Sequence, residues 1–163
     1  MNIEWRKIND KDEKILKSWL NETDRKMLCM QDKSWQQTAK DIEDCLKFME
    51  GSQFRNAIGY CGDTPVCAMM FGVELSGTVL RIYNLLVNPA CRCQGIGKQA
   101  IRDVFSKENK FCLKRTFSKV VGAVYPENFS SIRLCNSVGL SDKSKNDEYI
   151  DFSCDLTKKL DHK

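Results

Sequence analysis

The stretch that most constrains the fold is an apolar run that stops at a proline and leads through a short loop into a helical pattern. Residues 85–87 are Leu-Leu-Val, and Pro89 halts the run. Beyond the loop, apolar residues recur at the three- and four-residue spacing of one helix face. They are Ile96, Ala100, Ile101, Val104 and Phe105. The sequence therefore predicts a strand, a loop and a helix in direct succession.

The loop has the composition of an anion-binding site. It contains Arg92, Gly95 and Gly97 and no acidic residue. The first turn of a helix leaves backbone N–H groups without partners and carries a partial positive charge, and glycine lets a bulky anion approach the backbone. We therefore predict that backbone N–H groups of this loop bind a phosphate, with Arg92 and Lys98 adding positive charge. The alternative is that the glycines only allow the helix to pack closely on the sheet.

Two common phosphate loops do not match this stretch. The P-loop requires four residues between its glycines, whereas one residue separates Gly95 from Gly97. Gln99 also stands where the P-loop requires Ser or Thr. The dinucleotide-binding pattern tolerates Ala100 at its third position, but it needs an acidic residue about 20 residues further on, and none lies at 115–120.

Charge and cysteine usage exclude several classes of protein. The net charge of the 163-residue chain is +4, with acidic and basic residues interspersed, which does not predict nucleic-acid binding. No apolar run approaches the ~20 residues that span a bilayer, and no signal-peptide pattern opens the chain, so we expect a cytoplasmic protein that does not bind membranes. Nine cysteines occur without a Cys-x-x-Cys pair, and the only histidine is His162. We therefore expect reduced thiols and no metal site.

The whole chain predicts one α/β domain over residues 1–163, in which helices flank a mixed, mostly antiparallel sheet. Alternating apolar residues and turn signals indicate the strands, while caps and helical spacing indicate the helices. Strands are expected at 3–8, 56–61, 66–74, 79–87, 118–125 and twice within 140–156, and helices at 10–20, 34–50, 96–105 and 128–139. Residues 21–33 read as a loop or a short helical turn, and residues 158–163 as a frayed tail.

The strand at 79–87 changes its pattern midway. Leu80 and Ile82 share one parity, whereas Leu85 and Val87 share the other. Side chains alternate between the faces of a sheet, so one inserted residue moves every later side chain to the opposite face. The pattern therefore predicts a β-bulge near residues 83–85.

Two motifs in this order of elements resemble those of the GCN5-related N-acetyltransferases (the GNAT family). Val-x-Pro followed by Arg-x-x-Gly-x-Gly, from Val87 through Gly97, resembles the acetyl-CoA-binding motif of that family. A later segment, with Asn128, Ser131 and a Gly-Leu pair at its end, resembles the motif beside the pantetheine arm of CoA. The resemblance extends over roughly residues 3–156, in the order β-α-α-β-β-β-α-β-α-β-β.

The resemblance implies transfer of an acetyl group from acetyl-CoA to a primary amine by direct attack. It implies that backbone N–H groups of the loop bind the pyrophosphate and that the edge of the strand at Leu86 and Val87 pairs with pantetheine. A backbone N–H there would stabilise the oxyanion. The expected cofactor-binding residues are Leu86, Val87, Arg92, Cys93, Gln94, Gly95, Ile96, Gly97, Lys98, Asn128 and Ser131. For Asn128, plain helix capping is an equal alternative.

The residues that handle protons match the family less well. Where some members carry a glutamate base, this chain has Arg81, so Glu74 and Tyr83 are the candidates for removing the amine proton. Glu74 is otherwise a solvated strand residue and Tyr83 a core residue. Cys135 stands where many members place a tyrosine that protonates the CoA thiolate, and a thiol is acidic enough to do so. The alternative is that Cys135 only packs, and that water or Tyr125 donates the proton.

Two other functions remain open at this point. The chain can be a CoA-binding module of the same fold without catalysis, or an unrelated nucleotide-binding domain that uses Gly95 and Gly97. If it is a transferase, the acceptor is a small molecule or a protein amine that enters over residues 21–33 and 143–147. We expect a monomer or a homodimer.

Overall fold

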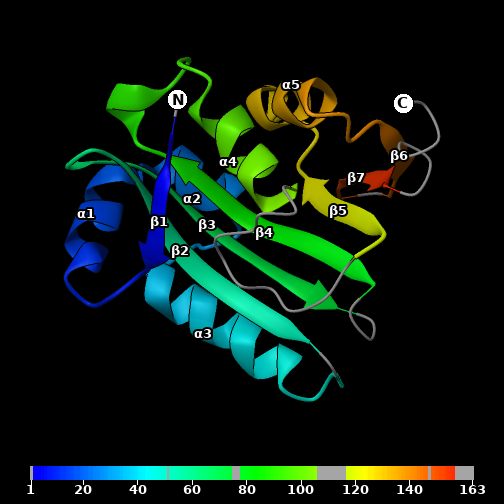
Figure 1. The fold of residues 1–163 in the computed structure, drawn as a ribbon, viewed down its shortest axis with the longest axis horizontal. Coiled ribbons are helices and arrows are strands. Elements are labelled where there is room, and N and C mark those ends of the chain that lie inside the picture. Colours follow the sequence, from blue (N-terminus) through cyan, green and yellow to red (C-terminus); the bar gives the residue numbers. More distant parts are fainter. Residues whose placement is uncertain (1, 51, 75–77, 106–116, 147, 157–163) are drawn as a thin grey trace.

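The computed structural model describes residues 2–50, 52–74, 78–105, 117–146 and 148–156. The tail at 158–163, which we expected to fray, lies outside these residues, as does Cys112. The described chain forms a mixed α/β fold, as the sequence predicts (Figure 1). The elements are β1 (Glu4–Lys7), α1 (Asp12–Trp19), α2 (Glu22–Met27), α3 (Trp35–Leu46), β2 (Gln53–Cys61), β3 (Thr64–Glu74), β4 (Val79–Val87), the 3-10 turn η2 (Pro89–Cys91), α4 (Ile96–Phe105), β5 (Lys119–Val124), α5 (Phe129–Ser137), β6 (Asp142–Lys145) and β7 (Ile150–Asp155).

The strands form one sheet in the order β1-β2-β3-β4-β5-β7-β6. The neighbours β1 to β4 pair antiparallel, as do β5 with β7 and β7 with β6. Only the central pair within this sheet, β4 and β5, is parallel, because α4 carries the chain back between them. The sheet is therefore mostly antiparallel, with one parallel join near its middle.

Helices cover the sheet from both sides. Apolar residues of α4 and α5, such as Ala100 and Cys135, pack with one set of strand residues. On the opposite face, Leu16 of α1 and Trp35 of α3 pack with a second set. Figure 1 shows α3 on one side of the strands and α4 and α5 on the other. No helix of the described chain is both long and apolar enough to cross a bilayer.

Local signals explain where the first helices begin. The Ser34 side chain accepts a hydrogen bond from the Gln37 N–H (3.1 Å) and so caps α3. Asn21 and Asp24 form a capping box that starts α2. Residues 21–33 thus contain a six-residue helix. Of the two interpretations that the sequence allowed, a loop or a short helical turn, the structure has the helical one.

The β-bulge that the sequence predicts lies at Tyr83. In the pairing of β3 with β4, Met70 lies opposite Asn84 and Phe71 opposite Ile82, so Tyr83 is the extra residue. As a result Leu80, Ile82, Leu85 and Val87 all join the core beneath α4 and α5. The bulge therefore lets one strand keep its apolar side chains on one face across a change of parity.

Candidate functional site

The strands β4 and β5 pair for only three residues and then separate. Val79–Arg81 lies beside Lys119–Val121, and the described residues of these two strands do not pair beyond Arg81. From there β4 continues to Val87 with β3 as its partner, while β5 pairs with β7. Figure 1 shows the two strands diverging toward their C-terminal ends. Leu86 and Val87, the predicted pantetheine-binding residues, lie on the separated part of β4.

Asn88 holds the turn that follows β4. Its N–H donates to the Val66 carbonyl (2.9 Å), and its side-chain amide donates to the Pro65 carbonyl (2.9 Å). Its side-chain oxygen accepts from the Ala90 N–H (3.0 Å). We did not single out this residue from the sequence, although an asparagine before a proline is a recognisable turn signal.

The two glycines of the loop meet different physical requirements. Gly95 has φ +80°, and a Cβ there would meet nothing within 4 Å, so its surroundings are open. A Cβ on Gly97 would lie 3.1 Å from Leu134 Cδ2, so this glycine allows close packing of α4 on α5. Gln99 N–H donates to the Gly95 carbonyl (3.0 Å), and the N–H groups just before Gln99 are those that a helix start leaves without intrahelical partners.

Arg92 is folded back onto neighbouring groups. Its Nε donates to the Val87 carbonyl (3.3 Å), and its guanidinium lies 3.0 Å from the Asp24 carboxylate of α2. Gln94 donates to the Ala90 carbonyl (3.3 Å), Cys93 is exposed with φ +62°, and Lys98 is half-buried. A phosphate at this loop would therefore compete with Asp24 for Arg92.

The predicted residues of α5 divide between capping and packing. Asn128 is the N-cap, and its side-chain oxygen accepts from the N–H of half-buried Ser131 (3.1 Å). Cys135 is buried in the core beneath α4 and α5, and burial raises the pKa of its thiol to about 11. Its position agrees with the packing alternative.

The structure brings Glu74 and Tyr83, the two candidates for the base, into direct contact. The buried Glu74 carboxylate accepts a hydrogen bond from the Tyr83 hydroxyl and is 3.0 and 3.1 Å from Arg81 Nε. Burial, and then the bond to Glu74, raises the pKa of Tyr83. Both oxygens of Glu74 are therefore already engaged by Arg81, the residue that stands where some family members carry a base.

A cluster that we did not predict bridges the separated strands. Cys29, just after α2, lies 3.4 Å from the Tyr125 hydroxyl at the end of β5, and that hydroxyl is 3.2 Å from the Tyr149 hydroxyl. Hydrogen bonds to Cys29 and Tyr149, followed by burial, raise the pKa of Tyr125. On the β4 side, Asn84 donates to the Leu28 carbonyl (3.2 Å). The segment after α2 therefore contacts both strands where they diverge.

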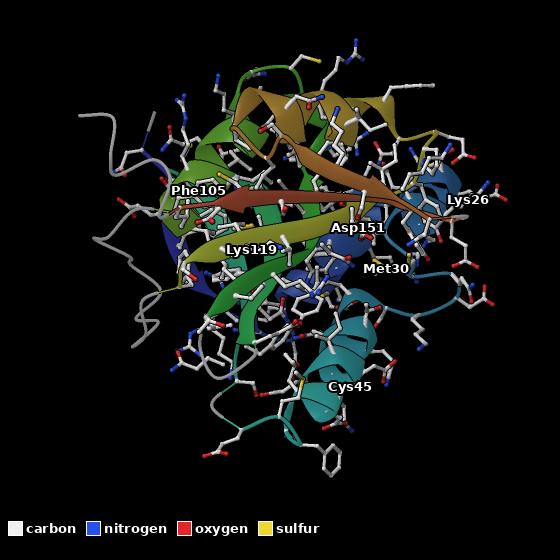
Figure 2. All side chains as sticks on the ribbon, turned by 90° about the vertical axis from the view of Figure 1, so that its right-hand side faces the viewer. Lys26, Met30, Cys45, Phe105, Lys119 and Asp151 are labelled. Atoms are coloured by element: carbon white, nitrogen blue, oxygen red, sulfur yellow. The ribbon has the colours of Figure 1, made fainter. Side chains whose placement is uncertain are left out.

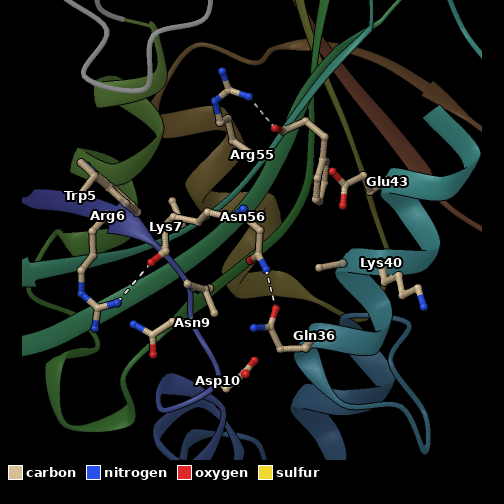
Figure 3. A pocket seen from close by; sticks show the side chains of 14 residues that line it. Trp5, Arg6, Lys7, Asn9, Asp10, Gln36, Lys40, Glu43, Arg55 and Asn56 are labelled. Carbon is tan, nitrogen blue, oxygen red and sulfur yellow. Dashed lines mark hydrogen bonds between the residues drawn. The ribbon is translucent and has the colours of Figure 1, made fainter. Parts of the chain in front are cut away.

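A hollow of about 710 Å³ lies elsewhere, between α3 and the strands β1 and β2. Figure 3 shows polar side chains around it, with the Asn56 amide reaching the Gln36 side chain (3.0 Å). In the strand order, β2 is separated from β4 by β3, so this hollow is not at the divergence. Among the described residues, no group of three His, Cys, Asp or Glu side chains is placed to hold a metal ion.

Comparison with solved structures identifies the fold. An acetyltransferase from Thermus thermophilus is 14% identical in sequence and superimposes with a TM-score of 0.70. The superposition covers 96% of this chain and 98% of the Thermus chain. Spermidine N-acetyltransferase from Vibrio cholerae, in complex with CoA and spermine, is 12% identical with a TM-score of 0.64, over 97% of this chain and 98% of the Vibrio chain. Campylobacter jejuni N-acetyltransferase PseH, in complex with acetyl coenzyme A, is 11% identical with a TM-score of 0.61, over 94% of this chain and 99% of the PseH chain.

Sequence comparisons give the family. No curated protein matches the chain. The family model described as acetyltransferase (GNAT) family matches residues 15–140, well over half of the chain. That match includes the separated part of β4, the loop and the start of α4. The chain therefore belongs to the acetyltransferase (GNAT) family.

Proposed function

We propose that this protein, as one domain over residues 1–163, transfers the acetyl group of acetyl-CoA to a primary amine. The observation that carries the proposal is the separation of β4 from β5 after three residue pairs, with the N-terminus of α4 following directly from the separated end of β4. An extended amide chain can pair with a free strand edge, and a pyrophosphate suits a helix N-terminus. Solved relatives in fold carry CoA or acetyl-CoA. The cytoplasmic location and the monomer or homodimer expected from the sequence belong to the same proposal.

In this proposal the cofactor spans the loop and the gap between the strands. Backbone N–H groups from Arg92 to Lys98 bind the pyrophosphate, and the exposed Gly95 leaves room for it. Pantetheine pairs with the edge of β4 at Leu86 and Val87, and the Asn128 amide and Ser131 face it from the start of α5. Arg92 turns from Asp24 toward the phosphates, since the pyrophosphate as a whole carries more negative charge than one carboxylate.

The amine nitrogen attacks the thioester carbonyl, and the C–S bond breaks as the amide forms. A backbone N–H of Leu86 or Val87 stabilises the oxyanion. Tyr125, placed where the strands diverge, protonates the leaving thiolate, while Cys135 packs in the core. Water takes the amine proton, because the Glu74 carboxylate already accepts hydrogen bonds from Arg81 and Tyr83.

Calorimetric titration of acetyl-CoA into three proteins tests the cofactor site. Gly95→Glu places a carboxylate in the proposed pyrophosphate site. Gly62→Glu is the matched control, since Gly62 also has a positive φ (+58°) and open surroundings but lies in the turn between β2 and β3. We expect wild type and Gly62→Glu to bind alike and Gly95→Glu to bind at least about ten-fold more weakly. Equal binding by all three, or none by wild type at millimolar acetyl-CoA, would overturn the proposal.

A second candidate is a CoA-binding protein without catalysis. It is favoured by Arg81, which stands where some family members carry a base, and by Cys135, which stands where many carry a tyrosine. Acetyl-CoA consumption with a panel of primary amines separates the two functions. Amine-dependent release of CoA supports the transferase, whereas binding without release supports the second candidate.

A further inference from the structure

On one face of the sheet α1 and α3 cover the first strands, and no described helix covers β5 and β7 on that face. Side chains of β5 that point to this face include Lys119 and Ala123, and both are exposed. Figure 2 views the molecule from this side, with Lys119 on β5 and Asp151 on β7. A hollow of about 420 Å³ lies here. It is lined by Arg81, Lys119, Val121, Lys143, Ser144, Asp151, Phe152 and Ser153.

Arg81 is held in this hollow by a carboxylate beneath it. Its Nε faces Glu74 at 3.0 Å, and Glu74 is only 8% exposed. No described residue accepts a hydrogen bond from the two terminal Nη groups, and the Arg81 side chain is 37% exposed. Tyr83 fixes the same carboxylate from the other side. The guanidinium is therefore positioned with its bidentate donor edge available to a ligand.

Three charged residues that line the hollow, Lys119, Arg81 and Asp151, lie at successive levels along the strands. Lys119 pairs with Val79 of β4 and with Asp155 of β7, and Arg81 lies two residues further along, opposite Val121. Asp151 pairs with Ala123, two residues beyond Val121 toward the diverging ends. At a rise of ~3.3 Å per residue, the carboxylate lies about 7 Å further along the strand direction. Lys143 adds less to the positive charge available for binding an anion, because its ammonium lies over the Phe152 ring, 5.2 Å from the ring centroid.

We propose that the acceptor is an amine that also carries a phosphate or carboxylate group. Arg81 and Lys119 bind the anionic group, and Asp151 attracts the ammonium toward the end where β4 and β5 diverge. The charges of the hollow thus orient the acceptor with its amine toward the thioester. This inference rests on the proposed acetyl transfer and adds the class of acceptor.

Matched acceptors test the charge requirement. We would compare 5-aminopentyl phosphate with 5-aminopentanol, and 6-aminohexanoate with hexylamine, at low ionic strength. We expect kcat/KM for the anionic member to exceed that for its neutral partner by about ten-fold or more in at least one pair. The pair with the larger ratio identifies phosphate or carboxylate as the preferred group. Ratios near one in both pairs would overturn the inference and leave the acetyl transfer intact.

Two variants locate the preference in the hollow. Lys119→Met removes an exposed cation and should reduce the ratio several-fold, and Arg81→Met should abolish it. Arg81→Met leaves the Glu74 carboxylate buried without its cation, so this variant can fail to fold. In that case Lys119→Met still tests the assignment. Lys145→Met, on exposed β6 outside the hollow, should leave the ratio unchanged. Equal losses in Lys145→Met and Lys119→Met would contradict the assignment.

Binding without turnover separates this inference from the proposed function. Titration of 5-aminopentyl phosphate into the protein without acetyl-CoA, followed by NMR, should shift resonances of Lys119 and Ser153, with weaker binding in Lys119→Met. If wild type does not bind acetyl-CoA but does bind this probe, the transferase proposal fails and the anion site stands. If acetyl-CoA binds and the probe does not, the anion site fails alone.

Discussion

A Cβ at Gly72 of β3 would lie 2.7 Å from the backbone carbonyl oxygen of Gln53 and 3.4 Å from a ring carbon of Tyr83. The Gln53 oxygen belongs to the backbone of a paired strand, so it cannot move away without disturbing the pairing of β2 with β3. The missing side chain therefore gives room both for close pairing of β2 with β3 and for the ring of Tyr83 at the bulge.

Gly72→Ala should lower the free energy of unfolding by about 1–3 kcal/mol, because the added methyl overpacks this contact. The control is Gly122→Ala on β5, where the nearest atom to a Cβ is the Ile82 oxygen at an ordinary 3.7 Å. Chemical denaturation of both variants measures the difference. A Gly72→Ala protein as stable as Gly122→Ala would contradict the packing argument.

The buried Cys135 thiol calls for a different measurement. Burial raises its pKa to about 11, so it is a packed, protonated group at neutral pH. We expect Cys135→Ala to keep kcat within about two-fold while losing roughly 1 kcal/mol of stability, the cost of a small cavity. Tyr125→Phe, in contrast, should lower kcat, since it removes the proposed donor. A large loss of kcat in Cys135→Ala together with an unchanged kcat in Tyr125→Phe would instead assign proton donation to Cys135.

At the scale of elements, α2 links the two halves of the candidate site. Asp24 belongs to its capping box and also pairs with Arg92 of the loop. The residues after α2 contact Asn84 of β4 and Tyr125, the residue that follows β5. A helix of six residues, with the segment that follows it, thus contacts the loop and both diverging strands.

Asp24→Asn should leave Arg92 free for the phosphates of acetyl-CoA. An exposed ion pair is worth ~0.2–1 kcal/mol, so we expect binding to tighten by about two-fold, while Arg92→Met should weaken it. Asparagine preserves the size of the side chain and a capping oxygen. Calorimetry compares the two variants, and weaker binding by Asp24→Asn would show that the pair preorganises the loop.

The elements that depend on local sequence were predictable, while their pairing was not. The helical spacing of apolar residues predicts α4, and the parity of Leu80 and Leu85 predicts the bulge. The Cys29–Tyr125 contact joins residues 96 positions apart, and no local pattern encodes it. Glu74 and Tyr83 were each recognisable as polar groups near the site, but only the strand register shows that they bind each other.

At the scale of the whole molecule, an ion pair fastens α1 to the edge of the sheet. Asp12 is 2% exposed, and Arg6 of β1 contacts both of its carboxylate oxygens at 2.6 and 2.7 Å. The same guanidinium donates to the Tyr60 hydroxyl of β2 (2.6 Å). The hydrogen bonds from Arg6, and to a lesser degree that from the Asn9 N–H, hold the pKa of Asp12 below its ordinary value.

A lowered pKa makes Asp12 stabilise the fold only while it is ionised. Its contribution is complete above the ordinary pKa of about 3.9 and is lost as the pH falls through the lower value of the folded state. Asp12→Asn should therefore cost about 1–3 kcal/mol at pH 7, and the gap to wild type should narrow below about pH 4. Urea unfolding from pH 3 to pH 7 measures this. A gap that stays constant over that range would contradict the linkage.

The join between β4 and β5 also has a mechanical consequence. Extended antiparallel ladders hold β1 to β4 together and β5 to β7 together, whereas three residue pairs connect these two plates. Few backbone hydrogen bonds therefore fix the angle between the two plates, while side chains of α4 and α5 pack across the join. The width of the gap is therefore set by the side chains that span it, and substitutions there can adjust it for wider or narrower ligands without unpairing either plate.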